Sequence, residues 1–151
     1  MKLALLLALT LVSTASAAHA DRLPKSAVAL TPAAVTAFYS GKTANYAGIS
    51  KVFFDPDGTI KGVYGNPPKG WFTGTWSVKG NEGCMYPQEN DGKQHPNCNK
   101  YWQVGKRLYS LWSVHDDGSA VDLKNGYTYK DASKYTPGNS IAALYAKFGG
   151  K

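Results

Sequence analysis

Arginine is scarce in this sequence of 151 residues, where Arg22 and Arg107 are the only two among 17 basic side chains. Proteins that bind nucleic acids usually gather basic residues on one face and use arginine to contact base edges. Here the lysines are scattered, so we expect no nucleic-acid partner. The net formal charge of +7 instead fits a solvated basic surface, or attraction to anionic glycans or lipid head groups.

Catalytic signatures are also lacking. Glutamate occurs only at Glu82 and Glu89, and neither has the apolar neighbours that would raise the pKa of a general acid. His115 lies near Ser110 and Asp116, but no nucleophile elbow or oxyanion loop accompanies them. We therefore expect no catalytic residues, no enzyme activity, no metal site and no other cofactor.

Long apolar runs are absent after the first 20 residues. Residues 3–12 form an apolar core of about ten residues, which is short of the roughly 20 needed to span a bilayer. With Lys2 before it and Ala18-His19-Ala20 after it, this core predicts a secretory signal peptide over residues 1–20. We expect cleavage after Ala20, a periplasmic or secreted protein, no transmembrane segment in the mature chain, and a single β-rich domain over residues 21–151.

Cysteine occurs only at Cys84 and Cys98, at the two ends of a polar stretch. Export places both where disulfides form and persist. Their spacing is not the C-x-x-C of a dithiol oxidoreductase, and the nearby His95 offers only one of the two further ligands that zinc would need. We expect a disulfide that closes a loop of roughly 15 residues and contributes about 3 kcal/mol. Reactive thiols and a metal site are the alternatives.

The patterns that are present indicate β-structure between two helices. Residues 71–79 alternate between apolar and polar side chains, and residues 49–65 predict a hairpin around the turn Asp55-Pro56-Asp57-Gly58. Thr31 and Pro32 predict the start of a short helix that ends at Gly41. Residues 139–150 return to a helical period, with Asn139 or Ser140 as the expected N-cap, Gly149 at the end, and an apolar stripe of Ile141, Leu144, Tyr145 and Phe148. The expected fold is mainly β, a single antiparallel meander curled into a small barrel or half-barrel, with a short N-terminal and a C-terminal helix.

Aromatic residues are abundant, with 4 Trp, 10 Tyr and 5 Phe. Alternation along the strands places Trp76 and Trp112 in the core. It places Trp71, Tyr101 and Tyr109 on the opposite faces of their strands, where they are candidates for a platform that stacks against sugar rings. The alternative is that these three side chains pack under the C-terminal helix.

Several segments carry a family resemblance, namely "VTAFYSGKT" at residues 35–43, "FFDPDGTIKG" at residues 53–62, "GTWSV" at residues 74–78, Cys84, Cys98 and the aromatic strands that follow. On these segments the chain resembles the small secreted bacterial proteins of the domain of unknown function 995 family. The resemblance covers most of the mature chain. It implies an exported all-β domain with a cysteine pair, and it implies no activity and no functional residues.

The function expected is a binding module for a small apolar ligand in the mouth of the barrel, or for an envelope glycan on an aromatic strip. The alternative is a protein-interaction module, such as an inhibitor of an envelope enzyme, that uses the stapled loop 84–98. A hydrolase is the least favoured class. The partners to be considered are therefore a small ligand, an anionic glycan and an envelope protein.

Overall fold

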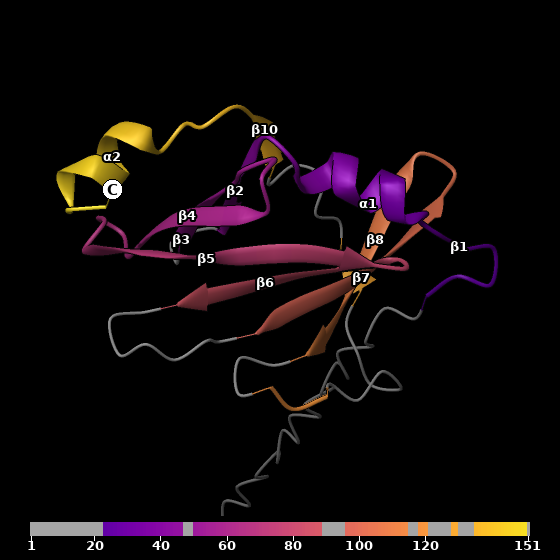
Figure 1. Ribbon diagram of the computed structural model, residues 1–151. Helices are drawn as coiled ribbons and strands as arrows, with labels where there is room; N and C mark the ends of the chain where they lie inside the picture. The colour runs from indigo at the N-terminus through magenta and orange to yellow at the C-terminus, as the bar shows by residue number, and fades with distance from the viewer. Residues whose placement is uncertain are drawn as a thin grey trace, which may run out of the picture.

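The protein is an antiparallel β-sheet curled into a half-barrel with two short helices (Figure 1). The structure, a computed structural model, describes residues 23–46, 50–88, 96–114, 118–120, 128–129 and 135–150. Its elements are β1 (Val28–Ala29), α1 (Pro32–Tyr39), β2 (Lys42–Tyr46), β3 (Ser50–Phe54), β4 (Thr59–Tyr64), β5 (Gly70–Lys79), β6 (Glu82–Gln88), β7 (Asn97–Val104), β8 (Arg107–Val114), β9 (Thr128–Tyr129), β10 (Tyr135–Pro137) and α2 (Ala142–Lys147). The expected fold class is confirmed.

The sheet departs from a simple meander at both ends of the chain. Its strand order is β10-β2-β3-β4-β5-β6-β7-β8-β9, and β1 pairs with β7 beside this path. Every pairing is antiparallel, and β10 returns from the end of the chain to pair with β2. Because β1 and β10 add strands from both ends, residues far apart in the sequence meet across the sheet.

Helix α1 begins and ends where its sequence predicts. The Thr31 hydroxyl oxygen accepts a hydrogen bond from the backbone N–H of Ala34 at 3.2 Å, and Pro32 occupies the first turn. Gly41 follows the helix with φ +70°, a left-handed conformation that glycine adopts without strain. Val35 and Tyr39 are buried, so this helix presents its apolar stripe to the sheet.

The main core lies between α1 and the inner face of the sheet, which we define as the face that carries Phe54, Ile60 and Phe72. Strand alternation places these side chains on one side, and all three are buried. The close approach of α1 requires Gly83 on β6, because a Cβ there would overlap the Tyr39 ring. The buried members of this core are Val35, Tyr39, Ala44, Val52, Phe54, Ile60, Phe72 and Tyr101.

Trp76 lies on the inner face as predicted, and it packs against the core while remaining half-buried. Its ring reaches the turn between β3 and β4, where the indole Nε1 donates a hydrogen bond of 2.7 Å to the carbonyl of Asp55. Trp112 is also half-buried, which makes both tryptophans more exposed than predicted.

A second, smaller core lies on the opposite, outer face of the sheet, under α2. Phe53, Val63 and Trp71 point to this face because each neighbours an inner-face position along its strand. Figure 1 shows α1 and α2 over opposite ends of the sheet. The helix residues in this core are the predicted apolar stripe, Ile141, Leu144, Tyr145 and Phe148.

The start of α2 differs from the expected capping. The N-cap residue is Ile141, which makes no side-chain capping hydrogen bond. The Asn139 side chain instead accepts a hydrogen bond from the Ile141 N–H just before the helix, at 3.2 Å. Gly149, with φ +92°, follows the helix as predicted. Within the described residues, no helix is long and apolar enough to cross a membrane.

Candidate functional site

The outer face of β5, β6 and β7 carries rows of polar side chains set by strand register. Lys79 on β5 pairs with Glu82 on β6, which in turn pairs with Lys100 on β7. Further along the strands, Thr75 pairs with Tyr86. Because side chains alternate between faces, these residues all point to the outer side. The row Lys79–Glu82–Lys100 and the Tyr86 position therefore belong to one continuous surface.

The hairpin of β7 and β8 extends this surface with an aromatic pair. Its two-residue turn, Gly105-Lys106, pairs Val104 with Arg107 and therefore Trp102 with Tyr109. Trp102 follows Lys100 by two residues on β7, so it shares the outer face with the lysine. Both aromatic side chains are half-buried.

The predicted stacking platform is wrong at Tyr101. This side chain is 0% exposed and belongs to the inner core, where its ring centroid lies 5.2 Å from that of Phe38. The cause is the register of the hairpin, which pairs Tyr101 with Ser110 on the inner face. Tyr109 therefore lies opposite Trp102 rather than beside Tyr101.

Trp71 lies on the outer face but under a helix. Its ring centroid is 5.6 Å from that of Tyr145 on α2, in an edge-on arrangement. It packs with the second core, which is the alternative that the sequence left open for it. Of the three predicted platform residues, only Tyr109 belongs to the surface described above.

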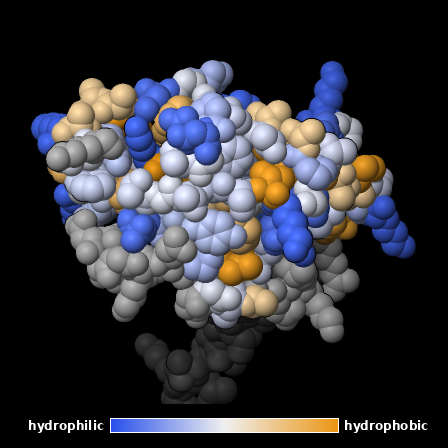
Figure 2. All heavy atoms as spheres, in the orientation of Figure 1, coloured by the Kyte–Doolittle hydropathy of each residue, from blue (hydrophilic) through white to orange (hydrophobic). Residues whose placement is uncertain are grey.

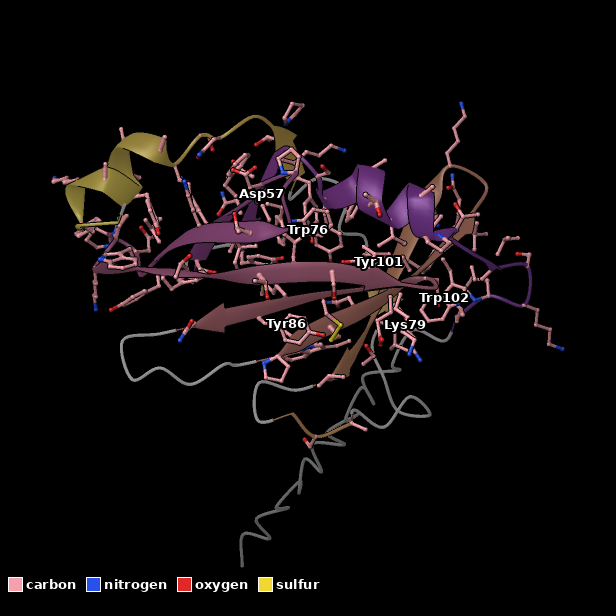
Figure 3. The ribbon with its side chains drawn as sticks, in the orientation of Figure 1. Asp57, Trp76, Lys79, Tyr86, Tyr101 and Trp102 are labelled. Carbon is pink, nitrogen blue, oxygen red and sulfur yellow. A yellow bond between two sulfur atoms is a disulfide. The ribbon has the colours of Figure 1, made fainter. Side chains whose placement is uncertain are left out.

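We call this surface the outer strip and define it by six residues: Lys79, Glu82, Tyr86, Lys100, Trp102 and Tyr109. Figure 2, in the same orientation as Figure 1, shows a face of the molecule on which hydrophilic side chains predominate and apolar residues are scattered. In Figure 3, Lys79, Tyr86 and Trp102 lie on one side of β5, whereas Tyr101 and Trp76 lie on the side of α1. Six residues of strand separate Trp102 from the position opposite Tyr86, so the strip is about 20 Å long.

The strip is positively charged. Lys79 and Lys100 flank a single carboxylate, Glu82, whose Oε1 accepts a hydrogen bond from the Ser113 hydroxyl at 2.5 Å. Lys51 pairs with Val63, and Lys61 pairs with Phe53. Because Phe53 and Val63 belong to the second core on the outer face, both lysines lie on that face too. Cations therefore outnumber carboxylates on this face of the strands.

The disulfide Cys84–Cys98 crosses the middle of the outer strip, as Figure 3 shows by its yellow bond. The two cysteines are directly opposite each other on β6 and β7, with Cα atoms 4.1 Å apart. Directly opposed residues in antiparallel strands have Cα atoms about 4.5–5.5 Å apart, which is close enough for a disulfide to join them. The predicted bridge is confirmed, and it ties together the two strands that carry Tyr86, Lys100 and Trp102.

A group of tyrosine hydroxyls lies on the inner face and was not predicted: Tyr39 and Tyr101 are buried, and Tyr46 and Tyr135 are half-buried. The hydroxyls of Tyr39 and Tyr101 are 2.5 Å apart, and those of Tyr46 and Tyr135 are 3.3 Å apart. Burial, aided by the neighbouring tyrosines, raises the pKa of Tyr101 and of Tyr135 well above 10.0. Both phenols therefore stay protonated at neutral pH, and the group acts as a hydrogen-bonded part of the core.

Other residues considered for chemistry lie elsewhere. Asp57 shapes the turn between β3 and β4, where hydrogen bonds from the Thr59 side chain and backbone lower the pKa of its carboxyl group. His95, His115 and Glu89 lie outside the described residues. In the part of the chain that the structure describes, no three His, Cys, Asp or Glu side chains are grouped as metal ligands would be.

A family model described as a protein of unknown function, DUF995, matches residues 6–133. The chain belongs to the DUF995 family. The DUF995 match includes the outer strip and both cysteines, and it ends before β10 and α2. Comparison with curated proteins and with solved structures gave no match. The family thus agrees with the resemblance found in the sequence, and DUF995 membership brings no activity with it.

The aromatic pair of this DUF995 protein was open to prediction from its sequence. Trp102 was not among the predicted site residues, which included its neighbour Tyr101, and adjacent residues on a strand point to opposite faces. A two-residue turn at Gly105-Lys106 places Val104 opposite Arg107. Counting two residues further from the turn along each strand then places Trp102 opposite Tyr109. The tyrosine group had no such local signal, because Tyr39 and Tyr135 meet only after β10 pairs with β2.

Proposed function

We propose that the protein is a non-enzymatic, exported module that binds a glycan along the outer strip. The observation that carries this proposal is the register of β5 to β8, which aligns the pair Trp102–Tyr109, the row Lys79–Glu82–Lys100 and Tyr86 on one sheet face. Export rests on the predicted signal peptide, and the disulfide agrees with an oxidising compartment.

Aromatic and polar side chains in this arrangement suit a carbohydrate chain. A sugar ring has an apolar C–H face that can lie on an aromatic ring, and its hydroxyl groups form hydrogen bonds at its edges. Tyr86, Trp102 and Tyr109 offer apolar rings with polar tips. Thr75 and Ser77, both exposed on β5, add hydroxyl groups beside them.

The rigidity of the strip also supports binding. Its residues lie on paired strands rather than on loops, and the disulfide joins β6 to β7 in its centre. A preformed surface loses less conformational entropy when it binds a ligand. A row of side chains about 20 Å long on the outer face fits an extended polymer better than a compact small molecule, which usually binds in a concave pocket.

The other binding modes from the sequence have less support. The inner face under α1 is filled by side chains such as Val52, Phe54 and Tyr101, each 0% exposed. This packing favours the outer face over an apolar ligand held in the half-barrel beneath the helix. Contact through the stapled loop 84–98 depends largely on residues 89–95, which lie outside the described residues.

The experiment compares two aromatic variants with a matched tyrosine control. Purified protein is titrated with a panel of soluble polysaccharides, and dissociation constants are measured by calorimetry. Tyr86→Ala and Trp102→Ala should each weaken binding by about tenfold, because a lost aromatic contact of about 1.4 kcal/mol corresponds to that factor. Tyr64→Ala, at a 39% exposed position outside the strip, should leave binding unchanged.

The proposal fails if no polysaccharide binds to the wild type. It also fails if Tyr64→Ala weakens binding as much as Tyr86→Ala and Trp102→Ala do. The thermal melting of each variant is compared with that of the wild type, to distinguish a loss of affinity from a loss of folding.

A further inference from the structure

We infer that the glycan is acidic, and that Lys79 and Lys100 bind its carboxylate groups. This inference rests on the proposed function of the outer strip and specifies the chemistry of its ligand. The two lysines lie in one row across three strands, with Glu82 between them. Adjacent strands are about 4.8 Å apart, so the Cα atoms of the two lysines are about 10 Å apart.

The carboxylate in this row does not cancel the charge of both lysines. Glu82 carries one negative charge against two positive ones, and one of its oxygens accepts the hydrogen bond from Ser113 on β8. A flexible lysine ammonium can turn toward a carboxylate on a ligand that lies over the row. The row therefore attracts anions, with the aromatic pair at one end of the strip and Tyr86 at the other.

The surroundings of the row strengthen this attraction. Lys51 and Lys61 lie on the same outer face, and the Lys61 ammonium is 6.0 Å from the centre of the Tyr145 ring. Asp57, at the turn between β3 and β4, accepts hydrogen bonds from the backbone and the side chain of Thr59. An acidic polymer would thus meet more lysines than carboxylates along the sheet, and the electrostatic field would favour its approach.

The ligand class follows from the spacing of these groups. Aromatic rings at both ends of the strip favour sugar rings, and the lysine row between them favours a negative charge. A polymer of uronic acid residues meets both requirements, because each of its sugars carries a carboxylate. A neutral polysaccharide would offer the two lysines no negative charge beyond that of Glu82.

The test uses a polyuronate and its methyl ester, which has the same sugar backbone without the charge. The wild type should bind the polyuronate at least about tenfold more tightly than the ester, and this preference should shrink as salt screens the lysines. The double variant Lys79→Gln/Lys100→Gln should lose the preference. Lys25→Gln/Lys69→Gln, which removes two exposed lysines outside the strip, should keep it.

Four results would overturn the inference. If the wild type binds acid and ester equally while Trp102→Ala abolishes binding of both, the ligand is a neutral glycan and only the proposed function stands. If the two double variants lose the same affinity, the attraction comes from net charge rather than from the row. If polyglutamate competes as well as the polyuronate, the strip selects acidic polymers in general and not sugars. Binding of neither polysaccharide would contradict the proposed function as well.

Discussion

Replacing Tyr101 and Tyr109 separately by alanine tests the assignment of faces in the hairpin of β7 and β8. Both residues are tyrosines on adjacent strands, but Tyr101 is 0% exposed in the core and Tyr109 is half-buried on the outer strip. Tyr101→Ala should therefore be far more destabilising. Tyr109→Ala should instead weaken glycan binding.

The size of the Tyr101 effect follows from what its side chain buries. An aromatic side chain buries about 150–250 Å², which at about 25 cal/mol per Å² gives about 4–6 kcal/mol as an upper estimate. Truncations of buried Phe and Trp to Ala cost about 3–5 kcal/mol. Tyr101→Ala also removes the hydrogen bond between its hydroxyl and that of Tyr39. We expect a loss of about 3–5 kcal/mol for Tyr101→Ala and no more than about half of that for Tyr109→Ala.

Urea denaturation followed by circular dichroism measures both free energies of unfolding. A loss of about 3–5 kcal/mol is a large share of the roughly 5–15 kcal/mol that stabilises a domain, so the shift in midpoint is readily detected. Equal losses for the two variants, or a loss below about 1 kcal/mol for Tyr101→Ala, would refute the assignment of Tyr101 to the core.

Three further predictions concern pH, the disulfide and processing. The raised pKa of Tyr101 keeps its phenol protonated in the folded protein, whereas the same phenol in the unfolded chain ionises near pH 10. Its contribution to the free energy of unfolding is therefore present below pH 10 and falls by about 1.4 kcal/mol per pH unit above it. The urea midpoint of Tyr101→Phe should decline less steeply above pH 10 than that of the wild type. Cys84→Ala/Cys98→Ala should keep its β-rich spectrum and lose about 2–4 kcal/mol, and two free thiols in denatured, unreduced wild type would contradict the bridge. Intact-mass measurement of the exported protein should match residues 21–151, and a mass that retains residues 1–20 would exclude cleavage after Ala20.

Features with a local physical cause were predictable from the sequence. Thr31 and Pro32 specify the start of α1, because a hydroxyl cap and a proline suit the first turn. The turn Asp55-Pro56-Asp57-Gly58 joins β3 to β4 as expected, with Gly58 at φ +90°. The pair of cysteines and the predicted signal peptide together predicted the disulfide, because disulfides form and persist in an oxidising compartment.

Features that depend on how distant elements meet were harder to predict. Tyr101 and Trp102 are adjacent aromatics on one strand, and only the pairing of Trp102 with Tyr109 decides which of them faces outward. The inner position of Tyr101 also depends on α1, which packs over it from more than sixty residues away and places the Tyr39 hydroxyl against its own. The outer strip was therefore predicted at one residue, Tyr109, and the rest of it required the register of the sheet.

The measurement that tests the outer strip most directly is an NMR titration of ¹⁵N-labelled protein with a short oligouronate. The account predicts that shifted amides gather along the strip, at Thr75 to Lys79 on β5, Glu82 to Tyr86 on β6 and Lys100 to Tyr109 on β7 and β8. The amide chemical shifts of α1 and α2 should not change. Shifts centred on α1 or α2, or no shifts at saturating oligouronate, would contradict a glycan site on this face.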